Sequence, residues 1–149
     1  MAYLFLNGVP LVLVLVNSIT LGRVAVDPLG NVFVADFGND RIEKFDGNGK
    51  LLMTWGSLGQ NDGQLDNRTG MAVQFPSGNV YVVDTGNHRV QAFTNDEKFL
   101  NKWELPSGTS VVSPITGIDI DVNSAGTIFL TYADAGTIRV ISASPTMQK

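Results

Sequence analysis

The residues of this chain whose types and spacing could do chemistry are an aspartate and an arginine that recur five positions apart. The three pairs are Asp36 and Arg41, Asp84 and Arg89, and Asp134 and Arg139. A carboxylate at this spacing can accept the N–H groups of the intervening turn and can face the guanidinium. A catalytic residue is not normally duplicated at equivalent places along a chain. The recurrence therefore predicts a structural turn pair in each copy.

Other reactive constellations are sparse in the sequence. His88 is the single histidine, and cysteine is absent. A zinc site needs several converging ligands, and no carboxylate spacing here matches a calcium loop. The sequence has no Gly-x-Ser-x-Gly elbow, and one histidine leaves little basis for a catalytic triad. We therefore predict no catalytic residue, no metal and no cofactor.

The charge of the chain argues against a nucleic-acid partner. The chain has ten lysines and arginines and 14 aspartates and glutamates, so its formal net charge is −4. Nucleic-acid binding depends on clustered basic side chains that displace counterions. Here the basic residues are scattered singly along the sequence.

The elements that must position these residues belong to an internal repeat. Residues 31–41 and residues 79–89 are identical at seven of eleven positions, and a fainter third copy covers residues 126–139. Two tryptophans, Trp55 and Trp103, keep the same step of 48 residues. A period in the forties indicates one supersecondary unit copied along the chain.

Each copy reads as short alternating strands separated by glycine-, proline- and asparagine-rich turns. The predicted strands lie at residues 24–27, 32–35, 42–45 and 50–55, at 71–74, 80–83, 90–93 and 98–103, and at 118–121, 128–131 and 138–141. Four antiparallel strands in about 48 residues are typical of a β-propeller blade. The sequence thus predicts an all-β fold of stacked sheets, with the recurrent aromatic residues packed between them.

The copies resemble the NHL repeat, through Gly78-Asn-Val-Tyr-Val-Val-Asp-Thr-Gly-Asn-His-Arg89 and, in the first copy, residues 25–56. The resemblance covers roughly residues 22–141 and is weak in the third copy. It implies a propeller, commonly of six blades, of which this chain holds about three. We expect an apolar N-terminal segment at 1–21 and a propeller arc at 22–149, with blades at about 22–68, 69–115 and 116–149.

The blade count leaves two alternatives, because six blades need nearly twice this length. Two protomers could form a homodimer that completes one propeller, with the Leu11–Val16 strand of one filling the third blade of the other. Alternatively, the chain is part of a longer polypeptide, which the abrupt end of the third copy favours.

The N-terminal segment, residues 1–21, contains no charged side chain and includes an apolar run at 9–16. Alternating valines and leucines favour a buried strand at Leu11–Val16. A degenerate signal or membrane anchor remains an alternative, although the run lacks a basic start and is interrupted by polar residues and proline. A third alternative is an ill-defined chain start.

Two functions from different classes follow from the resemblance. A non-catalytic scaffold would bind a protein or peptide through its rim loops, and the candidate contact residues are Phe37, Asn39, Asp40, Asn87 and His88. The alternative is a propeller lyase or hydrolase with a metal or small-molecule site in the central channel. The scaffold fits a chain with one histidine and duplicated aspartates better than the enzyme does.

Overall fold

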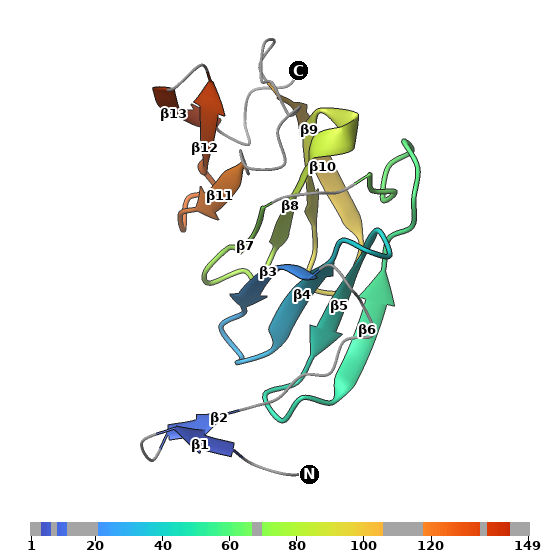
Figure 1. The fold of residues 1–149 in the computed structure, drawn as a ribbon, viewed down its shortest axis with the longest axis vertical. Helices are drawn as coiled ribbons and strands as arrows, with labels where there is room; N and C mark the ends of the chain where they lie inside the picture. Colours follow the sequence, from blue (N-terminus) through green and yellow to red (C-terminus); the bar gives the residue numbers. More distant parts are fainter. Residues whose placement is uncertain are drawn as a thin grey trace.

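The structure, a computed structural model, is built from short antiparallel strands (Figure 1). It describes residues 4–6, 9–11, 21–66, 70–105, 118–134 and 137–143, with side chains described for 22–66, 70–105 and 118–131. The described part has no helix long and apolar enough to cross a membrane. Its one helical element is a 3-10 turn, η1, at Thr85–Asn87.

Three sheets carry the repeat, and each is a meander in chain order. The first sheet comprises β3 (Leu21–Val26), β4 (Val32–Asp36), β5 (Arg41–Phe45) and β6 (Leu51–Trp55). The second comprises β7 (Met71–Val73), β8 (Val80–Asp84), β9 (Arg89–Phe93) and β10 (Phe99–Glu104). The third comprises β11 (Asp119–Val122), β12 (Ile128–Asp134) and β13 (Thr137–Ala143). The predicted all-β fold of four-stranded units is therefore confirmed in the first two copies.

A separate two-stranded hairpin precedes these sheets. It pairs β1 (Leu4–Leu6) with β2 (Val9–Leu11). The strand predicted at Leu11–Val16 meets this hairpin only at Leu11, and residues 12–16 lie outside the described part of the chain.

Side-chain oxygens shape the tight turns that reverse the meander. Asp27 accepts hydrogen bonds from the N–H groups two and four residues later, at 2.9 and 2.8 Å. Asp46 and Asn123 repeat this geometry in other turns, and the Thr94 hydroxyl accepts the N–H of Lys98 at 3.1 Å. These are Asx- and ST-type turns, which explains why a short polar residue begins each of these four turns.

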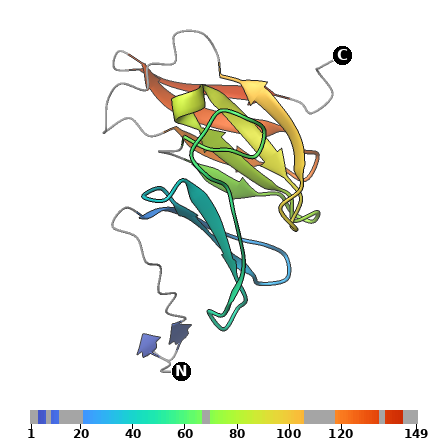
Figure 2. The ribbon, with the colours of Figure 1, turned by 90° about the vertical axis from the view of Figure 1, so that its right-hand side faces the viewer.

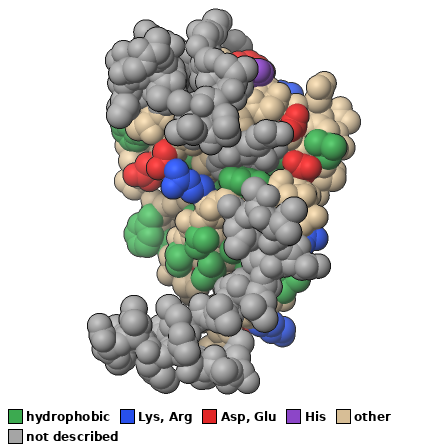
Figure 3. Space-filling view, viewed as in Figure 1, with side chains coloured by type: hydrophobic (Ala, Val, Ile, Leu, Met, Phe, Trp, Pro, Cys, Tyr) green, Lys and Arg blue, Asp and Glu red, His purple; other side chains and the backbone are tan. Residues whose placement is uncertain are grey.

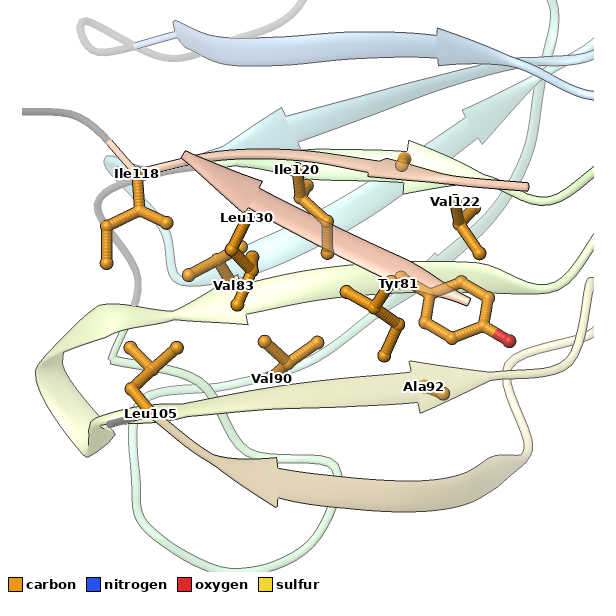
Figure 4. Close-up of a cluster of buried hydrophobic side chains, with 11 residues drawn as sticks. Tyr81, Val83, Val90, Ala92, Leu105, Ile118, Ile120, Val122 and Leu130 are labelled. Atoms are coloured by element: carbon orange, nitrogen blue, oxygen red, sulfur yellow. The ribbon is translucent and has the colours of Figure 1, made fainter. Parts of the chain in front are cut away.

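The sheets pack face to face, as the view turned by 90° shows (Figure 2). Alternation along β8 sends Val82 toward the first sheet and Val83 toward the third, and both are fully buried. The cluster between the second and third sheets mixes Tyr81 with aliphatic residues from β8, β9, β11 and β12 (Figure 4). Each sheet thus buries a face that it cannot bury alone.

Recurrent aromatic residues fill these interfaces, as predicted. The Trp55 ring meets Phe33 and Phe93 edge-on, with ring centroids 6.1 and 6.2 Å apart. Trp103, one repeat later, stacks on Tyr81 at 6.2 Å. Offset and edge-on contacts are the geometries that aromatic quadrupoles prefer.

The meander divides the loops between two ends of the sheets. One end, called here the linker rim, carries residues 37–40, 56–66 and 85–88. The opposite end, the turn rim, carries residues 27–31, 46–50, 74–79, 94–98 and 123–127. The aspartate–arginine pairs of the first two copies lie at the linker rim.

Candidate functional site

Asp84 is the centre of a buried polar cluster at the linker rim. Its carboxylate is fully buried and accepts the Arg89 Nε–H at 2.7 Å, since β8 and β9 place the two residues directly opposite each other. It also accepts the side-chain amides of Asn87 and Gln91 and the backbone N–H of Asp66, at 2.8 to 3.0 Å. Five hydrogen bonds to charged or amide donors compensate the burial of this charge.

Arg89 extends this cluster to the linker between the sheets. Its Nη1 donates to the Gln60 carbonyl, and its Nη2 donates to the Asn61 and Gln64 carbonyls, all at 2.9 Å. Gln91 donates to the Gln64 carbonyl at 2.7 Å and accepts the Gly63 N–H at 3.0 Å. The buried guanidinium therefore holds the loop at residues 57–66 in one shape, which is a structural role.

The first copy builds the same kind of centre around Asp36. Asp36 is fully buried and accepts the Arg41 Nε–H and the Asn39 amide, each at 2.9 Å. Glu43 occupies the place of Gln91 and pairs with Arg41 Nη2 at 2.7 Å. The Arg41 side chain is 32% exposed, against 5% for Arg89.

The third copy has a different register. Asp134 lies opposite Thr137, and Arg139 lies opposite Tyr132, so these two residues are not cross-strand partners as their counterparts are. The connection between β12 and β13 has two residues where the earlier copies have four. The structure does not describe the side chains of Asp134 and Arg139. The ion pair expected between them therefore stays a prediction.

The five predicted contact residues divide by environment. Asn39 and Asn87 have their amides on Asp36 and Asp84, and Asn87 also donates to the Gly59 carbonyl at 2.8 Å. Phe37 is half-buried and packs against the cluster between the first and second sheets. A Cβ added to Gly22 would lie 2.0 Å from the Phe37 ring, so the two residues are in close contact.

Asp40 and His88 lie at equivalent loop tips with left-handed backbone, at φ of 50° and 53°. The His88 side chain is exposed, while Asp40 is partly exposed. Leu58, 66% exposed on the neighbouring linker, adds an apolar side chain to the same rim. Asp62 and Lys102 pair at 2.6 Å on its surface. Figure 3 shows acidic, basic and hydrophobic side chains dispersed over one face of the described surface, without one continuous basic patch.

Sequence reasoning missed a second polar cluster, at the turn rim. Asn95 donates to the Asp27 carboxylate at 3.0 Å and accepts a hydrogen bond from Lys44, so it joins the second sheet to the first. Burial raises the pKa of Asp27, but the hydrogen bonds from Asn31, Asn95 and Leu29 outweigh it and hold this pKa below its usual value. Asn95 reads in sequence only as a turn residue, because no local pattern reports a contact 68 residues away.

Metal-binding capacity is low in the described residues, where no three His, Cys, Asp or Glu side chains form a group able to hold an ion. An exposed ion pair, Arg23 with Asp119 at 3.5 Å, joins β3 and β11. Pairs this exposed contribute little to stability and do not constitute a reactive site.

Comparison with solved structures identifies the architecture of the chain. The chain has the fold of β-propeller blades, and it aligns with a streptogramin B lyase at a TM-score of 0.55 and 15% identity, over 85% of this chain and 41% of that one. An inactive H270A virginiamycin B lyase from Staphylococcus aureus aligns with a TM-score of 0.56 and 15% identity, over 88% and 43%. A protein of unknown function from Bacteroides caccae aligns with a TM-score of 0.54 and 14% identity, over 93% of this chain and 52% of that one.

The repeat itself is identified by a family model. Residues 69–93 match the NHL repeat, which confirms the resemblance read from the sequence. No curated protein matches this sequence. The chain spans about two-fifths of the length of the lyases it resembles, and identities of 15% establish the fold alone.

Proposed function

We propose that this chain is a non-catalytic NHL-repeat scaffold that binds a protein or peptide through its linker rim. The observation that carries the proposal is that the buried and the loop-tip side chains of that rim have different roles. Ionisable and amide groups converging on Asp84 are engaged in holding the loops, while equivalent loop tips present different side chains, Asp40 in one copy and His88 in the next. Repeat proteins that bind partners typically keep their strands alike from repeat to repeat and vary the side chains on their loops.

The composition of the rim supports a polypeptide partner. Leu58 offers an exposed apolar side chain at the linker rim, and the same rim carries the polar side chains of His88, Asp40 and Asp62. Interfaces commonly combine a buried apolar or aromatic anchor with such a polar border. The acidic balance of the chain disfavours nucleic acid.

The proposal is tested by comparing two surface variants for partner capture. A Leu58→Ala, His88→Ala double variant alters the linker rim, and Leu29→Ala alters an 85% exposed leucine at the turn rim. Quantitative mass spectrometry of proteins captured from host extract should show a partner retained by the wild type and by Leu29→Ala but lost by the double variant. Equal recovery on all three would contradict the proposal.

The same preparations test the enzymatic alternative. A metal-dependent propeller lyase or hydrolase would carry its ion through purification. Elemental analysis that finds a stoichiometric divalent metal, lost when Asp119 on β11 is replaced, would overturn the scaffold proposal in favour of an enzyme.

A further inference from the structure

The third sheet carries two acidic side chains on the face that points away from the second sheet. Ile120 and Val122 point from β11 into the cluster shared with the second sheet (Figure 4). Asp119 and Asp121 alternate with them along the strand, so they lie on the opposite face, where both are exposed. Phe129, directly opposite Asp121 on β12, lies on this face too and is 38% exposed. We call this face, with Asp119, Asp121 and Phe129, the end face.

The earlier sheets have alanine where the end face has Asp121. In the second sheet Ala72 takes the place of Asp121, since it lies opposite the buried Tyr81. In the first sheet Ala25 takes this place, opposite the buried Phe33. Both alanines and both aromatic rings pack in the clusters shared with the next sheet along the chain. A small apolar residue at this place is therefore compatible with a following sheet.

Asp119 stands where the second sheet has a glycine. Gly70 precedes Ala72 by two residues, as Asp119 precedes Asp121. A Cβ added to Gly70 would lie 2.8 Å from the backbone carbonyl oxygen of Ile118 in the third sheet. The contact between successive sheets is thus so close at this place that it leaves no room for a side chain.

We propose that Asp119 and Asp121 form a charged cap that prevents a further blade from stacking on the end face. Stacking in the geometry of the second and third sheets would press the Asp119 side chain against the backbone of the added sheet. It would also bury the Asp121 carboxylate in an apolar cluster like the one around Ala72, which is costly for an unpaired charge. Terminal units of repeat arrays need a polar outer face for the same reason. The inference does not use the linker rim and is independent of the proposed function.

The other end of the arc shows what the cap acts against. Val24 and Val26 on β3 are 63% and 57% exposed. They flank Ala25 as two buried residues of β11 flank Asp121. An uncapped end face could therefore meet Val24 and Val26 of another copy, and repetition of this head-to-tail contact would give rings or filaments. The cap opposes this contact, including its use in a homodimer that closes one propeller.

Restoring the small residues of the second sheet tests the cap. In the Asp119→Gly, Asp121→Ala variant the end face has the residue types of Gly70 and Ala72. We expect this variant to self-associate at least about tenfold more tightly than the wild type. Sedimentation velocity of the full chain over a series of concentrations gives the dissociation constant of each. Asp119→Asn, Asp121→Asn removes the charges but keeps the bulk, so its gain should be smaller.

A matched control neutralises two exposed carboxylates elsewhere. Asp96→Asn, Glu97→Gln changes the net charge equally at the turn rim and should leave self-association unchanged. Val26→Asp, added to the Asp119→Gly, Asp121→Ala variant, should abolish the gain because it places a carboxylate on the opposing face.

Circular dichroism and thermal unfolding establish that each variant is folded before sedimentation. Asp121→Ala alone introduces no glycine into β11 and should still associate more tightly than the wild type, so it decides the matter if the double variant fails to fold. The proposal is overturned if the folded end-face variants associate no more tightly than the wild type. It is also overturned if the Asp96→Asn, Glu97→Gln control gains as much, or if the gain survives Val26→Asp.

Discussion

At the residue scale, Asp36 and Asp84 are both buried and both accept the Nε–H of the arginine five residues later. Asp84 is fully buried and accepts hydrogen bonds from four different residues, each of which belongs to the loops or strands at one rim. A carboxylate satisfied this completely has little freedom to act as a base or nucleophile. Removing this carboxylate should therefore lower the free energy of unfolding.

Replacing Asp84 with Asn keeps the shape of the side chain and removes the charge opposite Arg89. Because this removes the 2.7 Å carboxylate partner of a buried guanidinium and leaves it only the half-exposed carboxylate of Asp62 at 3.9 Å, we expect the free energy of unfolding to fall by about 3–5 kcal/mol. Chemical denaturation followed by circular dichroism measures this loss. Asp62→Asn removes an exposed carboxylate from the same rim and should cost less than about 1 kcal/mol. Similar losses for both variants would contradict the assigned role.

Asp27 gives a pH-dependent expectation at the same scale. Its pKa is lower in the folded chain than the usual value of about 3.9, so its ionised form favours the folded state. This contribution is complete above about pH 3.9 and is lost as the pH falls through the folded pKa.

The free energy of unfolding of the wild type should therefore fall more steeply than that of Asp27→Asn as acid is added below about pH 4. Urea denaturation at a series of pH values gives both curves, and carboxylates common to the two chains cancel in the difference. Parallel curves would show that Asp27 has no such linkage.

At the scale of elements, the linker loop and the short 3-10 turn η1 support each other. The Gly86 N–H donates to the Asp66 carbonyl at 2.8 Å, and a Cβ on Gly86 would lie 2.3 Å from the Asp66 carboxyl carbon and 2.5 Å from its backbone oxygen. This close backbone approach explains the glycine in the repeat more directly than turn flexibility does.

Gly86→Ala should push Asp66 away and break its hydrogen bond to Asp84. We expect a destabilisation of about 1–3 kcal/mol, together with faster amide hydrogen exchange at residues 57–66. Gly47→Ala provides the control, because its nearest neighbour outside the turn would be 3.4 Å away. A neutral Gly86→Ala with unchanged exchange would show that the contact does not hold the loop.

At the scale of the whole molecule, stability is shared between sheets. Val82 and Val83 are adjacent and fully buried, yet they serve different interfaces, the first toward the first sheet and the second toward the third. In such arrays the stability of each unit includes its contacts with neighbours.

Val82→Ala and Val83→Ala should each cost about 1.5–3 kcal/mol, from two lost methyl groups and the cavity left behind. If the sheets unfold as one unit, both variants shift a single transition, in which tryptophan fluorescence and circular dichroism coincide. Two separated transitions in either variant would show that the interfaces are energetically independent.

Much of this architecture is readable from local pattern. Period-two alternation and recurring turn residues place the strands within one to three residues at each end, because strand pairing and Asx turns depend on neighbours close in sequence. The same spacing marks Asp36 with Arg41 and Asp84 with Arg89, which form ion pairs at 2.9 and 2.7 Å.

What the sequence leaves open is decided by contacts between distant segments. The repeat makes Arg41 and Arg89 look alike, yet among the described residues it is Arg89 that donates to backbone carbonyls of the linker at residues 57–66. Phe37 reads as a loop residue but packs beside Gly22, and Asn95 reaches Asp27 across 68 residues. Local periodicity specifies the strands and turns of one unit, whereas the environment of each side chain depends on which unit is stacked against it.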